Sequence, residues 1–210
     1  MTNNYNEIAR IYDALSRVVF GHAIINAQLY LISFIGNENK VLIAGGGTGW
    51  ILEKISKLNK EDILVVYVEK SAAMITLAKK RNFRNIEVQF INMAAEDYDT
   101  TEKFDVVITP FFFDNFKEEK IEHMFSKLSN NLKQNGLWLY ADFINDKSNK
   151  KLWQQFLLKV MYLFFRITAK IETQKLIDMR QYFARKYAEI SRKLFYKNFI
   201  QAVAYKKISN

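Results

Sequence analysis

A cluster of glycines in the first quarter of the chain has the residue types and spacing of a ligand-binding loop. Four of the chain's seven glycines lie between Gly45 and Gly49. The apolar run Val41–Ala44 before them predicts a buried strand, and the apolar rhythm that starts at Trp50 predicts a helix after them. A strand, a glycine turn and a helix in this order let backbone N–H groups and a helix N-terminus come close to a ligand. We therefore expect Gly45 to Gly49 to line the functional site.

The spacing of these glycines argues against two familiar phosphate-binding loops. A dinucleotide-binding loop needs Gly-x-Gly-x-x-Gly, and its third glycine falls on Trp50 when counted from Gly45 and on Leu52 when counted from Gly47. A Walker loop is excluded because no Gly-Lys-Ser or Gly-Lys-Thr follows. A dinucleotide-dependent dehydrogenase is therefore disfavoured, although it stays among the alternatives.

The segment Ala44–Gly49 instead resembles motif I of the class I S-adenosylmethionine (SAM)-dependent methyltransferases. In that family the loop passes under the methionine part of the cofactor, where a Cβ would collide with it. Glu69, about 20 residues further on, matches the family's acid that accepts hydrogen bonds from the ribose hydroxyls. Lys70 to Met74 match the stretch after this acid, and the resemblance implies that Met74 covers one face of the adenine.

Two further segments extend the resemblance. Asn92–Asp97 is similar to the family's adenine-recognition turn, in which Ala94 takes the place of the usual Asp or Asn and the backbone N–H of Ala95 is left to bind the adenine. Phe104–Thr109 resembles the strand that precedes the family's acceptor site. The resemblance thus implies SAM as the cofactor and methyl transfer as the reaction. The residues that it assigns to the cofactor are Tyr12, Gly45, Gly46, Gly47, Thr48, Gly49, Glu69, Lys70, Met74, Ala94, Ala95, Thr109 and Pro110.

Four phenylalanines follow, between Phe111 and Phe116, where the acceptor of this family meets the methyl group. They favour a small aromatic or lipophilic acceptor, although core packing explains any single one of them as well. Thr109–Phe112 keeps one proline of the Asn/Asp-Pro-Pro-Tyr/Phe motif but lacks its amide or acid, which argues against methylation of amino groups on nucleobases or glutamine. Positioning does most of the catalysis in methyl transfer from a sulfonium, and a general base is optional. The candidates for a catalytic role are Tyr12, His22 and Asp114.

The first helix is expected over residues 5–18, where it would form a lid over the cofactor crevice. Tyr12-Asp13 followed by Gly21-His22 resembles the start of ubiquinone/menaquinone C-methyltransferases, with a shorter spacing. This resemblance implies that Tyr12 packs near the methyl end of the cofactor. His22 could act as a base, but a lone histidine at a helix start more often has a structural role, and His123 is expected on the outer face of a helix.

Strand and helix patterns alternate between residues 40 and 142, which predicts an α/β fold with a doubly wound parallel sheet. Glu189–Phe195 and Phe199–Lys206 predict an antiparallel hairpin at a sheet edge. The family resemblance implies a Rossmann-like sheet of seven strands in the order 3-2-1-4-5-7-6, with strand 7 antiparallel. We expect one domain, composed of an N-terminal helical lid (1–36), a cofactor-binding core (37–145) and acceptor-side helices with a C-terminal hairpin (146–210).

Three helical segments in the second half complete the expected elements. A helix is predicted over Lys117–Leu132. Asn135-Gly136 is expected to stop it before a strand over Leu137–Asp142. Ser148–Thr168 and Leu176–Lys186 are the other two. Ser148–Thr168 is apolar over most of its perimeter but is too short and too interrupted by cations to span a bilayer.

The composition limits the cofactors and partners. The chain has no cysteine and two histidines, which leaves no thiolate site and makes a histidine-rich metal centre improbable, so we expect no metal. The net charge of +9 is uneven, because residues 146–210 contain 15 Lys and Arg against 4 Asp and Glu. This basic region suggests peripheral contact with a membrane, while the lack of a base-flipping motif disfavours nucleic acid.

The start of the chain lacks the basic and apolar plan of a signal peptide, so a cytoplasmic protein is expected. The helix expected over Ser148–Thr168, which is rich in aromatic residues, could also form a homodimer interface. Two alternatives to a small-molecule methyltransferase remain open. One is methylation of a nucleic acid or a protein, and the other is a SAM-binding regulator without catalytic activity.

Overall fold

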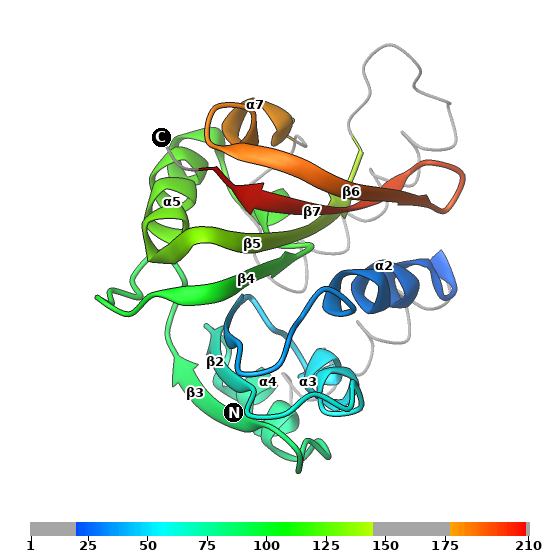
Figure 1. Cartoon of the computed structure of the whole chain (residues 1–210), viewed down its shortest axis with the longest axis vertical. Coiled ribbons are helices and arrows are strands. Elements are labelled where there is room, and N and C mark those ends of the chain that lie inside the picture. The colour runs from blue at the N-terminus through cyan, green and yellow to red at the C-terminus, as the bar shows by residue number, and fades with distance from the viewer. Residues whose placement is uncertain (1–19, 145–176, 209–210) are drawn as a thin grey trace.

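The computed structural model describes residues 20–144 and 177–208, which form a single sheet of seven strands with helices on both faces. The strand order is β3-β2-β1-β4-β5-β7-β6, with β3 and β6 at the two edges (Figure 1). Strands β1 to β5 pair in parallel, whereas β7 pairs antiparallel with both β5 and β6. The doubly wound sheet, its order and its antiparallel seventh strand are thereby confirmed. The strands are β1 (Lys40–Ala44), β2 (Leu64–Glu69), β3 (Glu87–Asn92), β4 (Phe104–Pro110), β5 (Leu132–Phe143), β6 (Tyr187–Phe195) and β7 (Ile200–Lys207).

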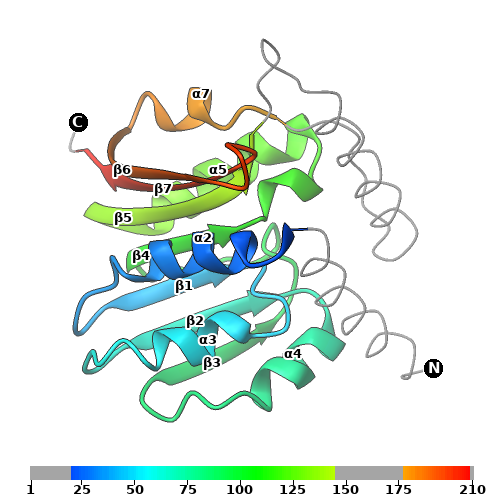
Figure 2. The same ribbon diagram turned by 90° about the vertical axis from the view of Figure 1, so that its right-hand side faces the viewer.

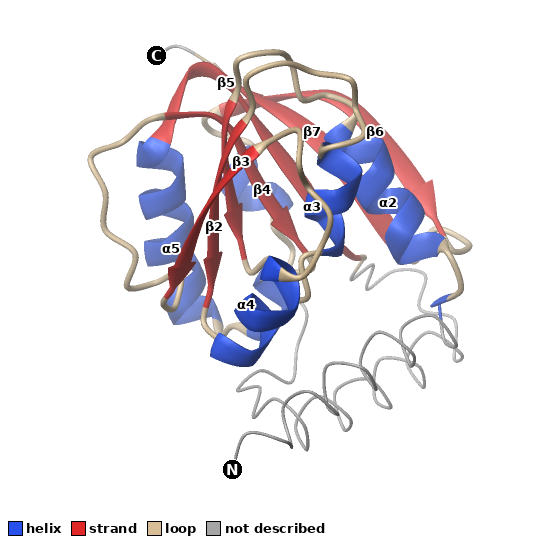
Figure 3. Ribbon diagram, turned by 90° about the horizontal axis from the view of Figure 1, so that it is seen from below, coloured by secondary structure: helices blue, strands red, loops and turns tan. Residues whose placement is uncertain are grey.

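The helices divide between two layers, one on each face of the sheet. Figure 2 shows α2, α3 and α4 in a row on one face, and Figure 3 shows α5 on the opposite side. Successive residues of β1 place their side chains alternately in the two layers, because side chains alternate between the faces of a strand. Ile43 packs in the layer of α2 to α4, whereas Leu42 packs with Met124 of α5. The helices are α2 (Ala23–Ile32), α3 (Trp50–Ile55), α4 (Ala72–Lys79), the 3-10 turn η1 (Phe113–Asn115), α5 (Glu118–Asn131) and α7 (Arg180–Phe183).

Helix α2 lies on the sheet over β5, β7 and β6. Its apolar side buries Ala27, Leu31 and Ile32, and the Tyr30 hydroxyl shares a hydrogen bond with Ser191 of β6. Residues 20–36 of the predicted lid therefore include a helix of the packed layer. The helix predicted over 5–18 lies outside the described residues, and a lid there stays a prediction.

The boundary between α5 and β5 differs from the sequence prediction. The helix predicted over Lys117–Leu132 ends within one residue of α5, at Asn131, but β5 begins at Leu132 rather than after Asn135-Gly136. Asn135 has a positive φ of 60°, and a Cβ on Gly136 would lie 2.7 Å from Leu132. The pair forms an irregularity inside β5, where the register with β4 shifts, rather than the turn before the strand.

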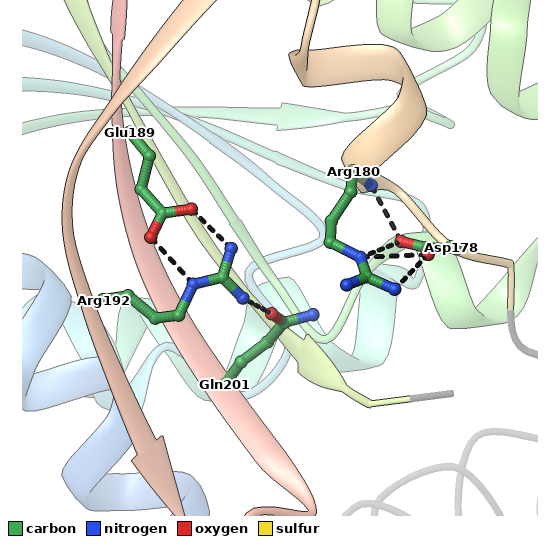
Figure 4. Close-up of polar contacts among 5 residues, drawn as sticks. All are labelled: Asp178, Arg180, Glu189, Arg192 and Gln201. Atoms are coloured by element: carbon green, nitrogen blue, oxygen red, sulfur yellow. Dashed lines mark hydrogen bonds and ion pairs between the residues drawn. The ribbon is translucent and has the colours of Figure 1, made fainter. Parts of the chain in front are cut away.

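The C-terminal hairpin is confirmed, whereas the helix before it is shorter than expected. Residues 177–179 and 184–186 are not helical, so only Arg180–Phe183 of the predicted helix Leu176–Lys186 forms α7. Asp178 holds the start of α7 by binding both the backbone N–H and the guanidinium of Arg180 (Figure 4). The helix predicted over Ser148–Thr168 lies outside the described residues.

An arginine fastens the two strands of the hairpin together. Arg192 on β6 donates to Gln201 on β7 at 2.6 Å and to Glu189 at 2.8 Å (Figure 4). The bond with Arg192 lowers the pKa of Glu189. Among the described residues, no helix is long and apolar enough to cross a membrane.

Candidate functional site

The glycine loop, Gly45–Gly49, joins the carboxyl end of β1 to the start of α3. Gly45, Gly47 and Gly49 have φ values of 72°, 65° and 74°, a backbone conformation that costs residues with a Cβ roughly 1–2 kcal/mol. Arg81 supports the loop from outside, because its guanidinium donates to the carbonyl of Thr48 at 3.0 Å. The turn is thus tight and held at its far end.

Packing explains why three of the four glycines lack a side chain. A Cβ on Gly45 would lie 2.6 Å from the ring of Phe112, one on Gly46 would lie 2.1 Å from the ring of Tyr67, and one on Gly49 would lie 2.5 Å from Ala78. Gly47 differs, because a Cβ there would meet no described atom within 4 Å. The Cα of Gly47 is therefore the point where a ligand can come against the loop.

Glu69 ends β2 next to this loop, with both carboxylate oxygens oriented by backbone groups. Oε2 accepts a hydrogen bond from the N–H of Gly47 at 3.0 Å, and Oε1 accepts one from the N–H of Ser71 at 2.8 Å. A carboxylate oxygen has two lone pairs, so each can accept one more hydrogen bond. The geometry fits the two vicinal hydroxyls of a ribose, and the contact of Glu69 with the cofactor stays a prediction.

The residues assigned to the adenine follow β2 and β3 at the same edge of the sheet. Ser71 caps α4 by accepting from the N–H of Met74 at 3.3 Å, which fixes the first helical turn, and Lys70 is exposed. Glu69 pairs with Asn92, so the turn of Ala94 and Ala95 starts beside the acid. Met74 and Ala94 are partly exposed, and Ala95 is 9% exposed. Their contacts with adenine stay a prediction.

Thr109 and Pro110 end β4, the strand beside β1. The Thr109 side chain is fully buried, and its hydroxyl accepts a hydrogen bond from the Trp138 indole at 2.9 Å. This side chain belongs to the packing of β4 against β5, so a contact with the cofactor falls to the backbone of Thr109. The sequence alone did not reveal the bond between the Thr109 hydroxyl and the Trp138 indole.

The aromatic turn, Phe111–Phe116, leaves β4 beside the glycine loop. Phe111 has a positive φ of 53°, a strained conformation for a bulky residue, and its N–H donates to Ala141 at 2.7 Å. The Asn115 amide holds the turn by donating to the carbonyls of Phe111 and Phe112 at 3.1 and 3.0 Å. Because the ring of Phe112 covers Gly45, the aromatic turn and the glycine loop are in direct contact.

Two aspartates, here called the acid pair, lie after β4 and at the end of β5. Asp142 accepts hydrogen bonds from the N–H groups of Phe143 and Asp114 and from the Tyr140 hydroxyl. Burial nevertheless raises the pKa of Asp142 to about 7. Burial, reinforced by the charge of Asp142, also raises the pKa of Asp114 well above its ordinary value. Near neutral pH the pair therefore retains a proton.

The two histidines are not brought into this group of residues. His22 is exposed at the start of α2 and makes no capping bond, and His123 is exposed on α5. Tyr12 lies outside the described residues. No group of ligands suited to a metal ion occurs within 20–144 and 177–208.

Sequence reasoning missed three residues of the site, Tyr67, Asn115 and Asp142. Tyr67 stands two positions before Glu69 on the same strand, so alternation alone places both side chains on one face. Asp142 is the next-to-last residue of β5, the last parallel strand, and the ligand crevice of such sheets lies at the carboxyl ends of the strands. Nothing in the sequence around Asn115 indicated its role.

Comparison with known proteins agrees with this geometry. A family model described as a methyltransferase domain matches residues 41–136, which include the glycine loop, Glu69 and the aromatic turn. The chain is 27% identical over 176 residues to a carboxy-S-adenosyl-L-methionine synthase from Nautilia profundicola, covering 79% of this chain and 74% of that protein. It is 30% identical over 171 residues to the ubiquinone/menaquinone biosynthesis C-methyltransferase UbiE from Wigglesworthia glossinidia brevipalpis, covering 78% of this chain and 65% of that protein.

These matches support a class I SAM-dependent methyltransferase. The solved structure of DhpI in complex with S-adenosylhomocysteine (SAH) has the same fold, with a TM-score of 0.67, 15% identity, and coverage of 100% of this chain and 96% of that one. SAM is the cofactor of this methyltransferase, and the residues present fit it. Gly47 offers an open Cα, and Glu69 offers two oriented oxygens for the ribose.

Proposed function

We propose that this methyltransferase transfers a methyl group from SAM to a small aromatic or lipophilic acceptor held beside the aromatic turn. The observation that carries the proposal is the contact of the Phe112 ring with Gly45. An acceptor lying on the exposed part of this turn would be next to a cofactor lying on the glycine loop. The partly exposed ring of Phe116 packs on the buried ring of Phe112 at 4.9 Å, which makes this part of the turn apolar, as a site for a flat aromatic compound requires.

The relatives support this class of acceptor. UbiE is named as a C-methyltransferase of ubiquinone and menaquinone biosynthesis, and quinones are flat ring compounds. The chain covers 65% of that protein, and the identity is 30%. The similarity therefore favours an aromatic acceptor without naming the compound.

Bound SAM would supply a methyl group on a positively charged sulfur, so that an acceptor bonding to the methyl carbon in line would leave the electron pair of the broken C–S bond on the sulfur of SAH. The chain's own contribution is to align the acceptor and to receive its proton. We assign the proton to the acid pair, Asp114 and Asp142, as a unit. Near neutral pH the pair can take up one further proton, since both pKa values are raised.

The acid pair predicts which acceptors react best. A phenol, enol or acidic C–H loses a proton during methylation, and the pair offers that proton a place out of water. A tertiary amine or thioether has no proton to lose and gains nothing from the pair. Acceptors of the first kind should therefore depend on Asp114, and acceptors of the second kind should not.

Methyl transfer from radiolabelled SAM to a panel of acceptors tests the proposal. Small phenols and quinols should be labelled, and bulk RNA or unrelated protein should remain unlabelled. Labelling of RNA or protein in preference to every small aromatic compound would overturn the proposal in favour of a macromolecular acceptor. SAH binding without labelling of any acceptor would favour a SAM-binding regulator without catalytic activity.

The similarity to a carboxy-S-adenosyl-L-methionine synthase favours a second candidate, modification of SAM itself. Mass spectrometry of the ligand released by heating the purified protein separates the two functions. Release of SAM or SAH supports the methyltransferase with an external acceptor, and release of carboxy-SAM supports the second candidate.

Contact with a membrane through the basic C-terminal region is a separate proposal. It rests on the surplus of 15 Lys and Arg over 4 Asp and Glu in residues 146–210. Flotation with vesicles of anionic lipid at low salt should carry the protein upward, and neutral vesicles should not. Absence of binding to the anionic vesicles would contradict the proposed membrane contact.

A further inference from the structure

Tyr67 is a fully buried phenol that reaches the glycine loop from below. It lies on β2, two residues before Glu69. Its ring occupies the place that a Cβ on Gly46 would need, at 2.1 Å. Its hydroxyl donates a hydrogen bond to the carbonyl oxygen of Gly47 at 2.8 Å. A tyrosine on the strand therefore touches two consecutive residues of the loop.

Gly47 is held by β2 from both of its backbone polar groups. Tyr67 binds the carbonyl at 2.8 Å, and Glu69 binds the N–H at 3.0 Å. Both side chains come from the same face of one strand, since two positions separate them. With φ at 65° and open space beside its Cα, Gly47 is otherwise free to rotate, because glycine has wide conformational freedom.

We infer that Tyr67 is a positioning residue for SAM, and that it acts together with Glu69 by fixing the orientation of Gly47. The hydroxyl keeps the Gly47 carbonyl turned down toward the strand. This orientation keeps the Cα of Gly47 open to the ligand and directs its N–H at Oε2 of Glu69. The carboxylate in turn stays aligned for the ribose. A loop held in this way loses less conformational entropy when the ligand binds.

Calorimetric titration with SAH tests the inference, and it needs no acceptor. Tyr67→Phe keeps the ring and removes the hydroxyl, and it should raise the Kd for SAH about 3- to 10-fold, the worth of one hydrogen bond. Tyr187→Phe is the matched control, because Tyr187 is also buried and donates to Ser129 Oγ at 2.7 Å, far along the chain from the loop. The control should bind SAH like the parent protein.

A double-mutant cycle separates joint action from simple destabilisation. In the Glu69→Gln background, Tyr67→Phe should change the Kd by less than about 2-fold, because the second anchor of Gly47 is already weakened. An equal fold-change in both backgrounds would overturn the inference, as would parent-like SAH affinity of Tyr67→Phe. An equal loss in Tyr187→Phe would show that general destabilisation is the cause.

Gly46→Ala provides an independent route to the same readout. The new Cβ should displace the Tyr67 ring, given the 2.1 Å separation, and lower SAH affinity in the folded protein. Parent-like SAH affinity of folded Gly46→Ala would also overturn the inference. Because every readout is SAH binding, failure of the proposed acceptor would leave these results unchanged.

Discussion

The backbone N–H of Gly47 donates a hydrogen bond to Oε2 of Glu69 at 3.0 Å. This bond links the loop after β1 to the acid after β2, two elements that are 22 residues apart in the chain. The loop and the carboxylate of Glu69 are therefore positioned together without a ligand. Loss of either partner should therefore impair one binding event, namely that of SAM.

Replacing Glu69 should weaken cofactor binding with little effect on folding. Glu69→Ala removes charge-assisted bonds to the ribose and should cost about 1–3 kcal/mol of SAM binding free energy. Glu87→Ala, which removes an exposed acid at the start of β3, is the control and should bind normally. Normal SAM affinity of Glu69→Ala would show that the ribose lies elsewhere.

A side chain on Gly47 should abolish SAM binding in a protein that still folds. No described atom lies within 4 Å of a Cβ at this position, so the expected cost to folding is the backbone strain of about 1–2 kcal/mol. Gly47→Ala should place a methyl group in the path of the ligand, and Gly47→Val a larger one. Equilibrium dialysis with SAH measures the loss.

Gly21 offers a matched control for this strain. It also has a positive φ, 55°, and open space beside its Cα, but it precedes α2 rather than the glycine loop. Gly21→Ala should be destabilised to a similar degree and should bind SAH like the parent protein. If both variants bind SAH equally well, the open side of Gly47 is not part of the cofactor site.

The Asn115 amide should stabilise the aromatic turn. Asn115→Ala removes donors to the carbonyls of Phe111 and Phe112 and should lower the free energy of unfolding by about 1–3 kcal/mol. The exposed Asn130→Ala should change it by less than about 0.5 kcal/mol. Urea unfolding measures both, and equal midpoints would contradict the role assigned to Asn115.

The acid pair should make the protein less stable as the pH rises. A carboxyl whose folded-state pKa is raised binds more protons in the folded than in the unfolded state between its two pKa values. Asp142, with a pKa raised from 3.8 to about 7, therefore destabilises the fold progressively from about pH 4 to pH 7. Over that range, the free energy of unfolding should fall by up to about 1.4 kcal/mol for each pH unit.

Asp142→Asn removes this titration and should flatten the decline. Thermal unfolding between pH 5 and pH 8 should show a smaller loss of Tm for the variant than for the parent protein. Asp178→Asn is the contrasting variant, because it removes a carboxyl whose pKa is shifted in the opposite direction: the hydrogen bond from Arg180 lowers the pKa of Asp178. Identical pH profiles of Asp142→Asn and the parent protein would contradict a raised pKa at this position.

The local patterns were sufficient to predict the parallel strands and the glycine loop, whereas the residues assigned to the cofactor came from the family resemblance and stay a prediction. Buried strands such as Leu64–Glu69 are near-continuous apolar runs, and Gly45 to Gly49 can adopt few other roles once the strand before them is recognised. Strand order and the antiparallel β7 came from the family resemblance rather than from physical reasoning. Both features hold in the structure.

What the sequence could not predict depends on contacts between distant residues. The start of β5 was misplaced because Asn135-Gly136 has the chemistry of a turn before a strand, whereas pairing of Leu132 with Phe104 draws the chain into β5 earlier. The hydrogen bond from the Tyr67 hydroxyl to the Gly47 carbonyl joins residues that are 20 positions apart. In the sequence alone, an apolar strand position filled by tyrosine indicates only a core residue. The meeting of Asp142 with Asp114 depends in the same way on the neighbouring positions of β4 and β5.

Calorimetric titration of the purified protein with SAM, SAH and NAD tests the central claim most directly. We expect SAM and SAH to bind with 1:1 stoichiometry and more tightly than NAD, because the loop lacks the third glycine of a dinucleotide site and Glu69 is aligned for a ribose. Tighter binding of NAD, or no binding of either sulfur compound, would contradict the account.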